Sequence, residues 1–119
     1  MNIRDVVDNT LNGTFITTTD PAGPGGAYHN YQVYDKNEHT LLGDIKFQNG
    51  PRNDPKSIRG LQMEDLLYIC IDRLECFQNG EYHTLENQIA LDHCKAALAT
   101  LQYRTKCRMK RGVEGTLQK

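Results

Sequence analysis

The sequence predicts an α+β fold, in which a small N-terminal antiparallel β-sheet is followed by a C-terminal hairpin of two long antiparallel helices. Up to about residue 60 the chain is rich in turn residues and carries short β-branched and aromatic segments. After Gly60 the apolar residues recur at helical spacing. The 119 residues, 38% of them hydrophobic, suit one domain. We expect a β-rich part over 1–60, the helical hairpin over 61–111 and a tail over 112–119.

Three segments of the first half are typical of strands, because they are β-branched or aromatic and partly alternate. They are 14–19, 28–34 and 41–47. The polar run 35–40 between the last two is expected to form a hairpin loop, and the proline- and glycine-rich run 21–26 a flexible loop. We also expect a short helix over Ile3–Asn9.

Two amphipathic helices are predicted in the second half. The first carries an apolar stripe of Met63, Leu67, Cys70, Leu74 and Phe77, which Leu66 and Ile69 broaden. Asn79-Gly80 is expected to end it with a left-handed residue. The second begins after Thr84 as N-cap, runs through Arg104 to Lys110, and ends at Gly112. A short turn between them implies an antiparallel hairpin. Phe-Gln-Asn-Gly occurs at 47–50 and at 77–80, where we expect it to close a strand and a helix respectively.

The stripe of the second helix changes from apolar residues to arginine. It consists of Ala90, Cys94, Ala97 and Leu101, followed at the same spacing by Arg104 and Arg108. The surrounding run 104–111 has five positive charges and no carboxylate, in a chain of net charge −1. A guanidinium at a core position must be paired with an anion, or must lie beyond the core.

Composition excludes several classes of protein. The longest apolar run, 66–71, is too short to span a membrane. Charged residues at positions 4, 5 and 8 stand where an export signal needs its apolar centre. The near-neutral net charge argues against a general nucleic-acid coat.

The cysteines indicate neither disulfides nor a metal site. Those at 70, 76, 94 and 107 form no C-x-x-C pair, and Cys70 and Cys94 are expected to be small buried thiols of a reduced cytoplasmic protein. His93 and Cys94 are adjacent on a helix and would point about 100° apart, so they are not expected to share a metal ion. No metal and no cofactor is predicted.

Five residues could bind a nucleotide: Arg52, Phe77, Asn87, Arg104 and Arg108. Phe77 offers an aromatic face for a base, Asn87 an amide that reads base edges, and the arginines guanidiniums for phosphates. Structural alternatives remain open for each. Phe77 could cap a core, Asn87 could cap a helix, the two helical arginines could form a solvated helix end, and Arg52 could lie in an ordinary surface turn.

Helix length decides how these residues could share a ligand. Asn87 and Arg104 are 17 residues apart, which is roughly 25 Å along a helix. One small ligand cannot contact both within one chain. An antiparallel two-fold dimer would bring Phe77 and Asn87 of one copy to Arg104 and Arg108 of the other, so a shared site would be intersubunit and present twice per dimer.

Several motifs, taken in order, resemble the first class of Thoeris anti-defence proteins, which are phage-encoded sponges for nucleotide immune signals. They are Gly26-Ala-Tyr-His29, Phe47-Gln-Asn-Gly-Pro-Arg52, Asp72-Arg-Leu-Glu-Cys-Phe-Gln78, Glu86-Asn-Gln-Ile-Ala-Leu91, Arg104-Thr-Lys-Cys-Arg108 and Arg111-Gly-Val-Glu-Gly-Thr116. The resemblance covers residues 20–116, and the first 20 residues match nothing.

The resemblance implies a β-sheet followed by two antiparallel helices, in dimers that assemble into hexamers. It also implies binding, without cleavage, of glycocyclic ADP-ribose made by TIR-domain proteins in the host cytoplasm. Phe77 would stack on adenine, Asn87 would hydrogen-bond the ligand, and Arg104 and Arg108 would hold base, ribose or phosphate with Arg52 nearby. Some members take up cyclic oligonucleotides at separate sites. The sequence does not place such a site here, and the glycine-rich loop 23–26 is a candidate because assembly of dimers could bring several copies of it together. No catalytic residue, membrane or nucleic-acid partner is implied.

Two other classes of function stay open. A hydrolase of the same nucleotide would need a positioned base or nucleophile, whereas the acids at 64, 65, 72 and 75 have the spacing of solvated helix faces. A nucleic-acid-binding dimer using the basic helix would bind long DNA or RNA with a steep loss on adding salt.

Overall fold

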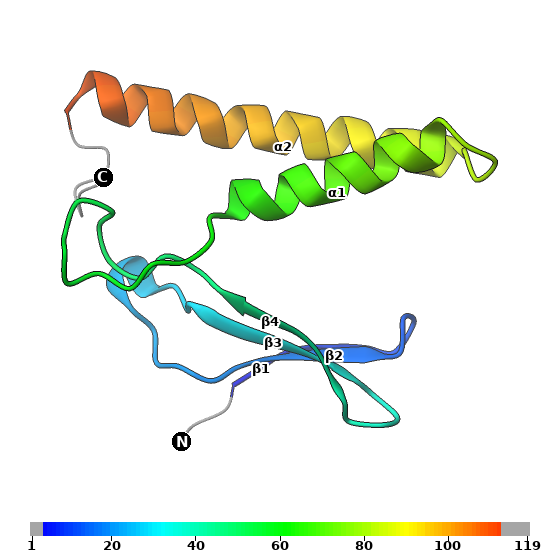
Figure 1. Ribbon diagram of the computed structural model, residues 1–119, viewed down its shortest axis with the longest axis horizontal. Helices are drawn as coiled ribbons and strands as arrows, with labels where there is room; N and C mark the ends of the chain where they lie inside the picture. The colour runs from blue at the N-terminus through cyan, green and yellow to red at the C-terminus, as the bar shows by residue number, and fades with distance from the viewer. Residues whose placement is uncertain (1–3, 113–119) are drawn as a thin grey trace. The chain divides into compact units, whose positions relative to one another are not determined.

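The computed structural model describes residues 4–112, which fall into two compact units divided between Leu61 and Gln62. The first holds a four-stranded antiparallel sheet and the second two helices (Figure 1). The predicted α+β class and its order along the chain are therefore confirmed. Of the predicted tail over 112–119, all but Gly112 lies outside the described residues, as do Ile3 and residues 113–116 of the last motif.

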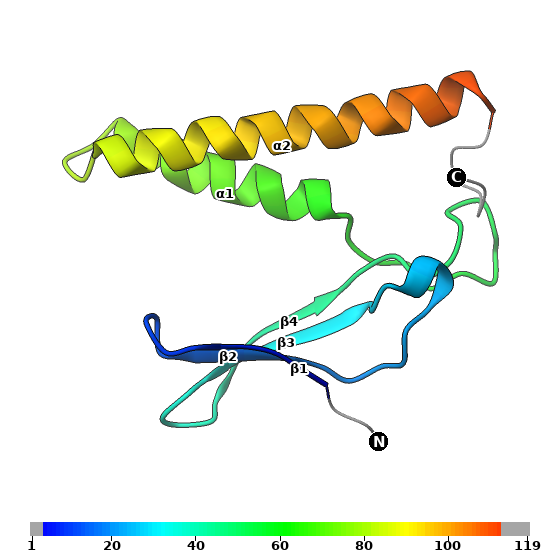
Figure 2. The same cartoon turned by 180° about the vertical axis from the view of Figure 1, so that it is seen from behind.

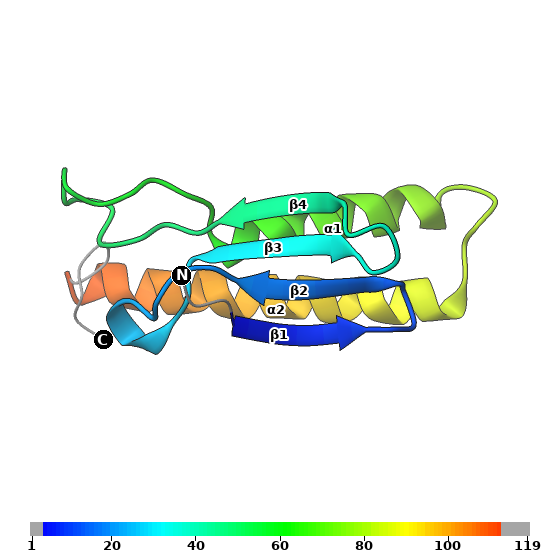
Figure 3. The same ribbon diagram turned by 90° about the horizontal axis from the view of Figure 1, so that it is seen from below.

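The strands follow one another across the sheet in chain order, β1-β2-β3-β4 (Figure 3). Their bounds are Arg4–Asn9 for β1, Thr14–Thr18 for β2, Asn30–Asp35 for β3 and Leu41–Lys46 for β4. The three strands predicted from β-branched and aromatic content are thus present, as is the hairpin loop between β3 and β4. A short 3-10 turn, η1 (Pro24–Gly26), lies in the glycine-rich loop between β2 and β3.

The predicted helix over Ile3–Asn9 is wrong, because Arg4–Asn9 forms strand β1. A tight turn that ends at Gly13, with φ of 73°, folds this segment back against β2. The β-branched pair Val6-Val7 suits a strand. An isolated helix of seven residues would satisfy few of its own backbone groups, whereas the strand shares hydrogen bonds with β2 along its length.

The segment 47–61 leads from β4 to the helical unit. Isolated bridges pair Phe47 with Leu61 and Asn49 with Ile58, so the segment folds back on itself. The Gln48 side chain accepts the Gly60 N–H (3.3 Å) and donates to Ser57 Oγ (3.2 Å). The first Phe-Gln-Asn-Gly copy therefore follows the end of a strand, as predicted.

The helical unit is a hairpin of α1 (Met63–Gln78) and α2 (Leu85–Lys110), which lie side by side and antiparallel (Figures 1 and 2). Thr84 is the N-cap of α2, and its Oγ1 accepts the Asn87 N–H at 3.0 Å, as predicted. Gly112, with φ of 74°, follows the end of α2.

The predicted left-handed end of α1 is wrong. Asn79 is right-handed helical (φ −87°, ψ −1°) and Gly80 has no positive φ. The final carbonyls of α1 are instead satisfied by the Asn79 N–H, which donates to Glu75 O, and the Gly80 N–H, which donates to Phe77 O. The Gln78 side chain then exchanges two hydrogen bonds of 3.0 Å with the Thr84 backbone, which closes the turn to α2.

The core of the hairpin is displaced from the two predicted stripes. Its buried residues are Ile71, Leu91 and Leu98, against which Leu67, Leu74 and Cys94 pack. Positions 67, 71 and 74 of α1 meet 91, 94 and 98 of α2 at the alternating three- and four-residue spacing of paired helices. Of the predicted stripes, Met63, Cys70 and Phe77 of α1 and Ala90 and Ala97 of α2 are exposed. The expectation that Cys70 is buried is therefore wrong, because it lies beside the α1–α2 seam.

Candidate functional site

The two flanks of the α1–α2 seam differ in chemistry. On one flank, Lys95 Nζ lies 3.5 Å from Glu75 Oε2, and Gln102 Nε2 donates to the Tyr68 hydroxyl at 2.8 Å. These contacts fix the register of the helices and identify that flank as polar. Successive residues of a helix are rotated by about 100° around its axis. On each helix, the residues on the side of the core positions away from these contacts therefore face the other flank.

This other flank, here called the arginine flank, is apolar in its middle and basic toward the end of α2. It comprises Met63, Leu66, Cys70, Arg73 and Phe77 from α1, and Glu86, Ala90, Ala97, Leu101, Arg104 and Arg108 from α2. Most of these residues are exposed, and Leu66, Leu101 and Arg108 are half-buried. The predicted stripe residues Leu67, Leu74 and Cys94 thus pack in the core, whereas most of the other stripe residues lie together on this flank.

Phe77 lies in the last turn of α1 with 36% of its surface exposed. The Arg73 guanidinium carbon lies 5.5 Å from the centroid of the Phe77 ring, within the range of a cation–π contact. Arg73 is not among the residues predicted from the sequence to bind a ligand. Its position one helical turn before Phe77 is the signal that could have identified it.

Asn87 lies in the first turn of α2, at the same end of the hairpin as Phe77. Its backbone N–H is held by the Thr84 cap, and its side-chain Nδ2 donates to Tyr82 O at 3.2 Å. Over residues 4–112 its Oδ1 has no hydrogen-bond partner. The amide is thus oriented by the turn while its oxygen can accept a hydrogen bond from a ligand.

Arg104 and Arg108 occupy the last two turns of α2. Arg104 is exposed, and Arg108 is half-buried and makes a contact of its own. Because α2 is one continuous helix, Arg104 lies roughly 25 Å along it from Asn87. The structure therefore keeps these arginines apart from Phe77 and Asn87 within one chain, as the sequence predicts. Arg52 is an exposed residue of the segment 47–61 in the first unit, where it also makes a contact.

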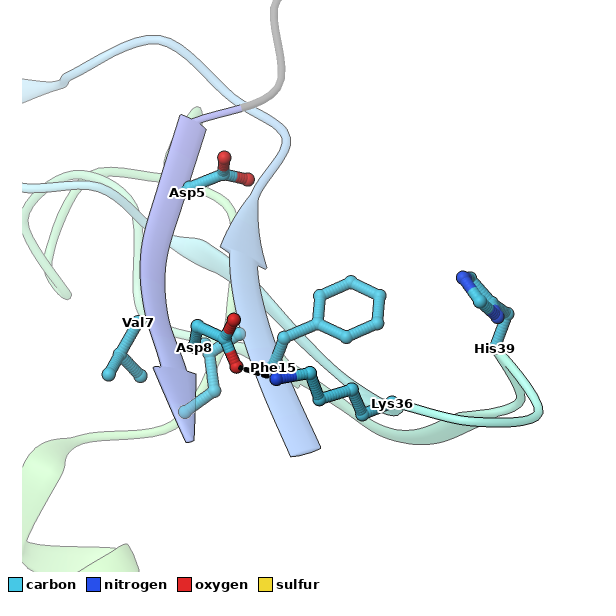
Figure 4. A pocket seen from close by; sticks show the side chains of 7 residues that line it. Asp5, Val7, Asp8, Phe15, Lys36 and His39 are labelled. Atoms are coloured by element: carbon cyan, nitrogen blue, oxygen red, sulfur yellow. Dashed lines mark hydrogen bonds and ion pairs between the residues drawn. The ribbon is translucent and has the colours of Figure 1, made fainter. Parts of the chain in front are cut away.

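A separate hollow of about 340 Å³ lies on the sheet (Figure 4), and none of the five predicted residues lines it. Its lining is Asp5, Val7, Asp8, Phe15, Ile16, Lys36 and His39. The Lys36 ammonium donates to Asp8 Oδ1 and Thr10 Oγ1, each at 2.8 Å, and its hydrogen bond is the main cause that lowers the pKa of Asp8. Because the cation is engaged and two carboxylates line the hollow, it does not suit an anionic nucleotide.

Residues 4–112 contain no group of three or more His, Cys, Asp or Glu side chains arranged for a metal ion, and all four cysteines are free thiols. No helix in this part of the chain has the length and apolar character needed to cross a membrane.

Comparison with known proteins identifies a relative. No protein-family model matches the chain. "Thoeris anti-defense 1" of Bacillus phage SBSphiJ7 is 41% identical over 78 residues, which are 66% of this chain and 54% of that protein. The match therefore spans about half the length of the relative. The resemblance noted in the sequence motifs agrees with this match, which supports a Thoeris anti-defence protein.

Proposed function

We propose that this protein counters Thoeris defence as a nucleotide sponge, which binds glycocyclic ADP-ribose in the host cytoplasm and retains it without cleavage. The relative's name supports the anti-Thoeris activity. The observation that carries the proposed mechanism is the arginine flank, where an exposed aromatic ring at one end and two arginines at the other share one side of the hairpin.

The binding site that we propose forms between two copies of the chain. An antiparallel two-fold dimer across the arginine flank would cover the apolar middle of each hairpin, including Ala97 and Leu101, and would place the turn of one copy against the basic end of its partner. Small alanine side chains allow helices to approach closely. Further assembly of such dimers into a hexamer is part of the same proposal.

The chemistry of this composite site suits an adenine nucleotide. The Phe77 ring would stack on the base and Asn87 Oδ1 would accept a hydrogen bond from it, while the guanidiniums of Arg104 and Arg108 would bind the pyrophosphate. The four carboxylates of α1 lie away from the arginine flank, and Glu86 at the start of α2 is the one carboxylate among the residues that define it. A hydrolase that uses an acid–base pair would need a second such group there. A sponge needs no turnover, because affinity and copy number set how far free signal falls.

Calorimetry of the purified chain against glycocyclic ADP-ribose tests the proposal. We expect tight, saturable binding of one ligand per chain, and recovery of intact ligand after the complex is heated. Duplex DNA serves as a control ligand, and cyclic di- and trinucleotides test for a second site. Recovery of a cleaved product would support a hydrolase, and binding of duplex alone with a steep salt dependence would support a nucleic-acid-binding protein.

Mixing two defective variants tests whether the site is shared between copies. Phe77→Ala and Arg104→Ala should each abolish binding while the protein stays dimeric. In a mixed dimer, one site carries both defects and the other carries neither. A fully exchanged equal mixture should therefore recover about one site in four. If mixed dimers form and no binding returns, the intersubunit arrangement is wrong.

A further inference from the structure

Charge is segregated around α1. Its four carboxylates, Glu64, Asp65, Asp72 and Glu75, lie toward the polar flank or the outer face of the helix. Arg73 is the only basic residue between Met63 and Gln78, and it lies on the arginine flank with Phe77. The single cation of an otherwise acidic helix thus faces the same side as Arg104 and Arg108.

The contact made by Arg73 leaves its donors uncommitted. The guanidinium carbon lies 5.5 Å from the Phe77 ring centroid, and over residues 4–112 the structure gives this side chain neither an ion pair nor a hydrogen bond. A guanidinium has five N–H donors in a planar fork that matches phosphate oxygens. The ring therefore orients an arginine whose hydrogen-bonding capacity is unused, beside an aromatic surface that is itself exposed.

We propose that Arg73 is an additional anion-binding residue of the nucleotide site, positioned by Phe77 to contact the pyrophosphate of an adenine dinucleotide stacked on that ring. The inference rests on the proposed function and adds a residue to it. The guanidinium contacts the aromatic ring, which leaves ring surface for the base and directs N–H donors toward the phosphates that follow it. Each site then receives Arg73 from one chain and Arg104 and Arg108 from the partner.

Calorimetry of Arg73→Gln against glycocyclic ADP-ribose tests this inference. Glutamine keeps helix propensity and much of the side-chain length but has no charge, so the fold and the dimer should persist. Loss of charge-assisted hydrogen bonds to phosphate should raise Kd by about tenfold to hundredfold. Arg73→Lys keeps the charge without the fork and should fall between the wild-type protein and Arg73→Gln. Arg59→Gln, at an exposed arginine of the sheet unit, is the matched control and should bind as the wild-type protein does.

The dependence of Kd on salt separates phosphate binding from a structural role. If Arg73 contacts phosphate, Arg73→Gln should show a shallower loss of affinity with salt than the wild-type protein. A weakened variant with an unchanged salt dependence would mean that Arg73 only holds the ring, and would overturn the inference. Unchanged affinity in Arg73→Gln would also overturn it while leaving the proposed function intact. Failure of the wild-type protein to bind any of the nucleotides would overturn the proposed function itself.

Discussion

At the scale of single residues, Asp20 shows how one side chain organises the glycine-rich loop. Its carboxylate oxygens accept the backbone N–H groups of His29 (3.0 Å) and Asn30 (3.1 Å). The buried His29 ring packs against Gly23, where any added Cβ would collide with the imidazole. His29 Nδ1 lies 3.4 Å from Asp20 Oδ2. Asp20 therefore joins both ends of the loop that contains residues 23–26.

We expect Asp20→Ala to lower the free energy of unfolding by about 1–3 kcal/mol, because two backbone donors lose their acceptor. Urea unfolding at neutral pH measures this loss. Asp44→Asn, at an exposed carboxylate of the same sheet, is the control and should change little. An Asp20→Ala protein as stable as the wild type would mean that water replaces the carboxylate at no cost.

The same carboxylate should contribute to the pH dependence of stability. Burial raises the pKa of Asp20, but the N–H donors of Asn30 and His29 outweigh it and hold the pKa below 3.8. A carboxyl group with a depressed pKa stabilises the fold above its unfolded pKa, and that contribution is lost as pH falls through the folded value. We therefore expect Asp20→Asn to lose less stability than the wild type between pH 5 and about pH 2. Urea unfolding of both proteins across that range measures the difference. Equal losses in the free energy of unfolding of Asp20→Asn and of the wild-type protein would contradict this prediction.

At the scale of elements, the prediction succeeds where a pattern is local and fails where it depends on a partner. The Thr84 cap, the end of α2 and strands β2 to β4 follow from residues close in sequence. β1 could not be recognised in this way, because Asp5-Val6-Val7-Asp8 becomes a strand only when β2 pairs with it. The core stripes were displaced because each helix carries two adjacent apolar stripes, and periodicity alone does not say which one faces the neighbouring helix.

The Thr84 cap should be measurable as an element-scale contribution. Thr84→Ala removes the acceptor for the Asn87 N–H and should lower the free energy of unfolding by about 1 kcal/mol. Thr84→Ser keeps a hydroxyl acceptor and should therefore keep most of the stabilisation that the cap provides. Chemical denaturation followed by helical circular dichroism measures both. Because the cap also positions Asn87, we expect Thr84→Ala to weaken nucleotide binding. Equal stability of the alanine and serine variants would show that the cap contributes nothing.

At the scale of the whole molecule, the candidate site cannot be read from one chain. Phe77 and Asn87 lie at the turn of the hairpin, and Arg104 and Arg108 lie near the far end of α2. The sequence predicts these residues as ligand-binding by type and spacing, and helix length implies that they can share one small ligand only if a partner combines them. What sequence could not supply is the flank on which they lie, because that depends on how α1 and α2 pack. The contacts on the polar flank determine it.

A matched pair of substitutions on α2 tests this assignment of flanks. Ala97 and Ala99 are both exposed, two residues apart in the middle of the helix, but Ala97 lies on the arginine flank and Ala99 on the other side. Glutamate is a good helix former, so neither Ala97→Glu nor Ala99→Glu should unfold the hairpin. In the proposed dimer Ala97→Glu buries an unpaired carboxylate, whereas Ala99→Glu leaves it in water. Sedimentation should therefore show single chains for Ala97→Glu and assembled chains for Ala99→Glu. Calorimetry should show no nucleotide binding for Ala97→Glu and retained binding for Ala99→Glu. The reverse pattern would place the partner on the polar flank. Assembly of both variants would show that the arginine flank is not the interface.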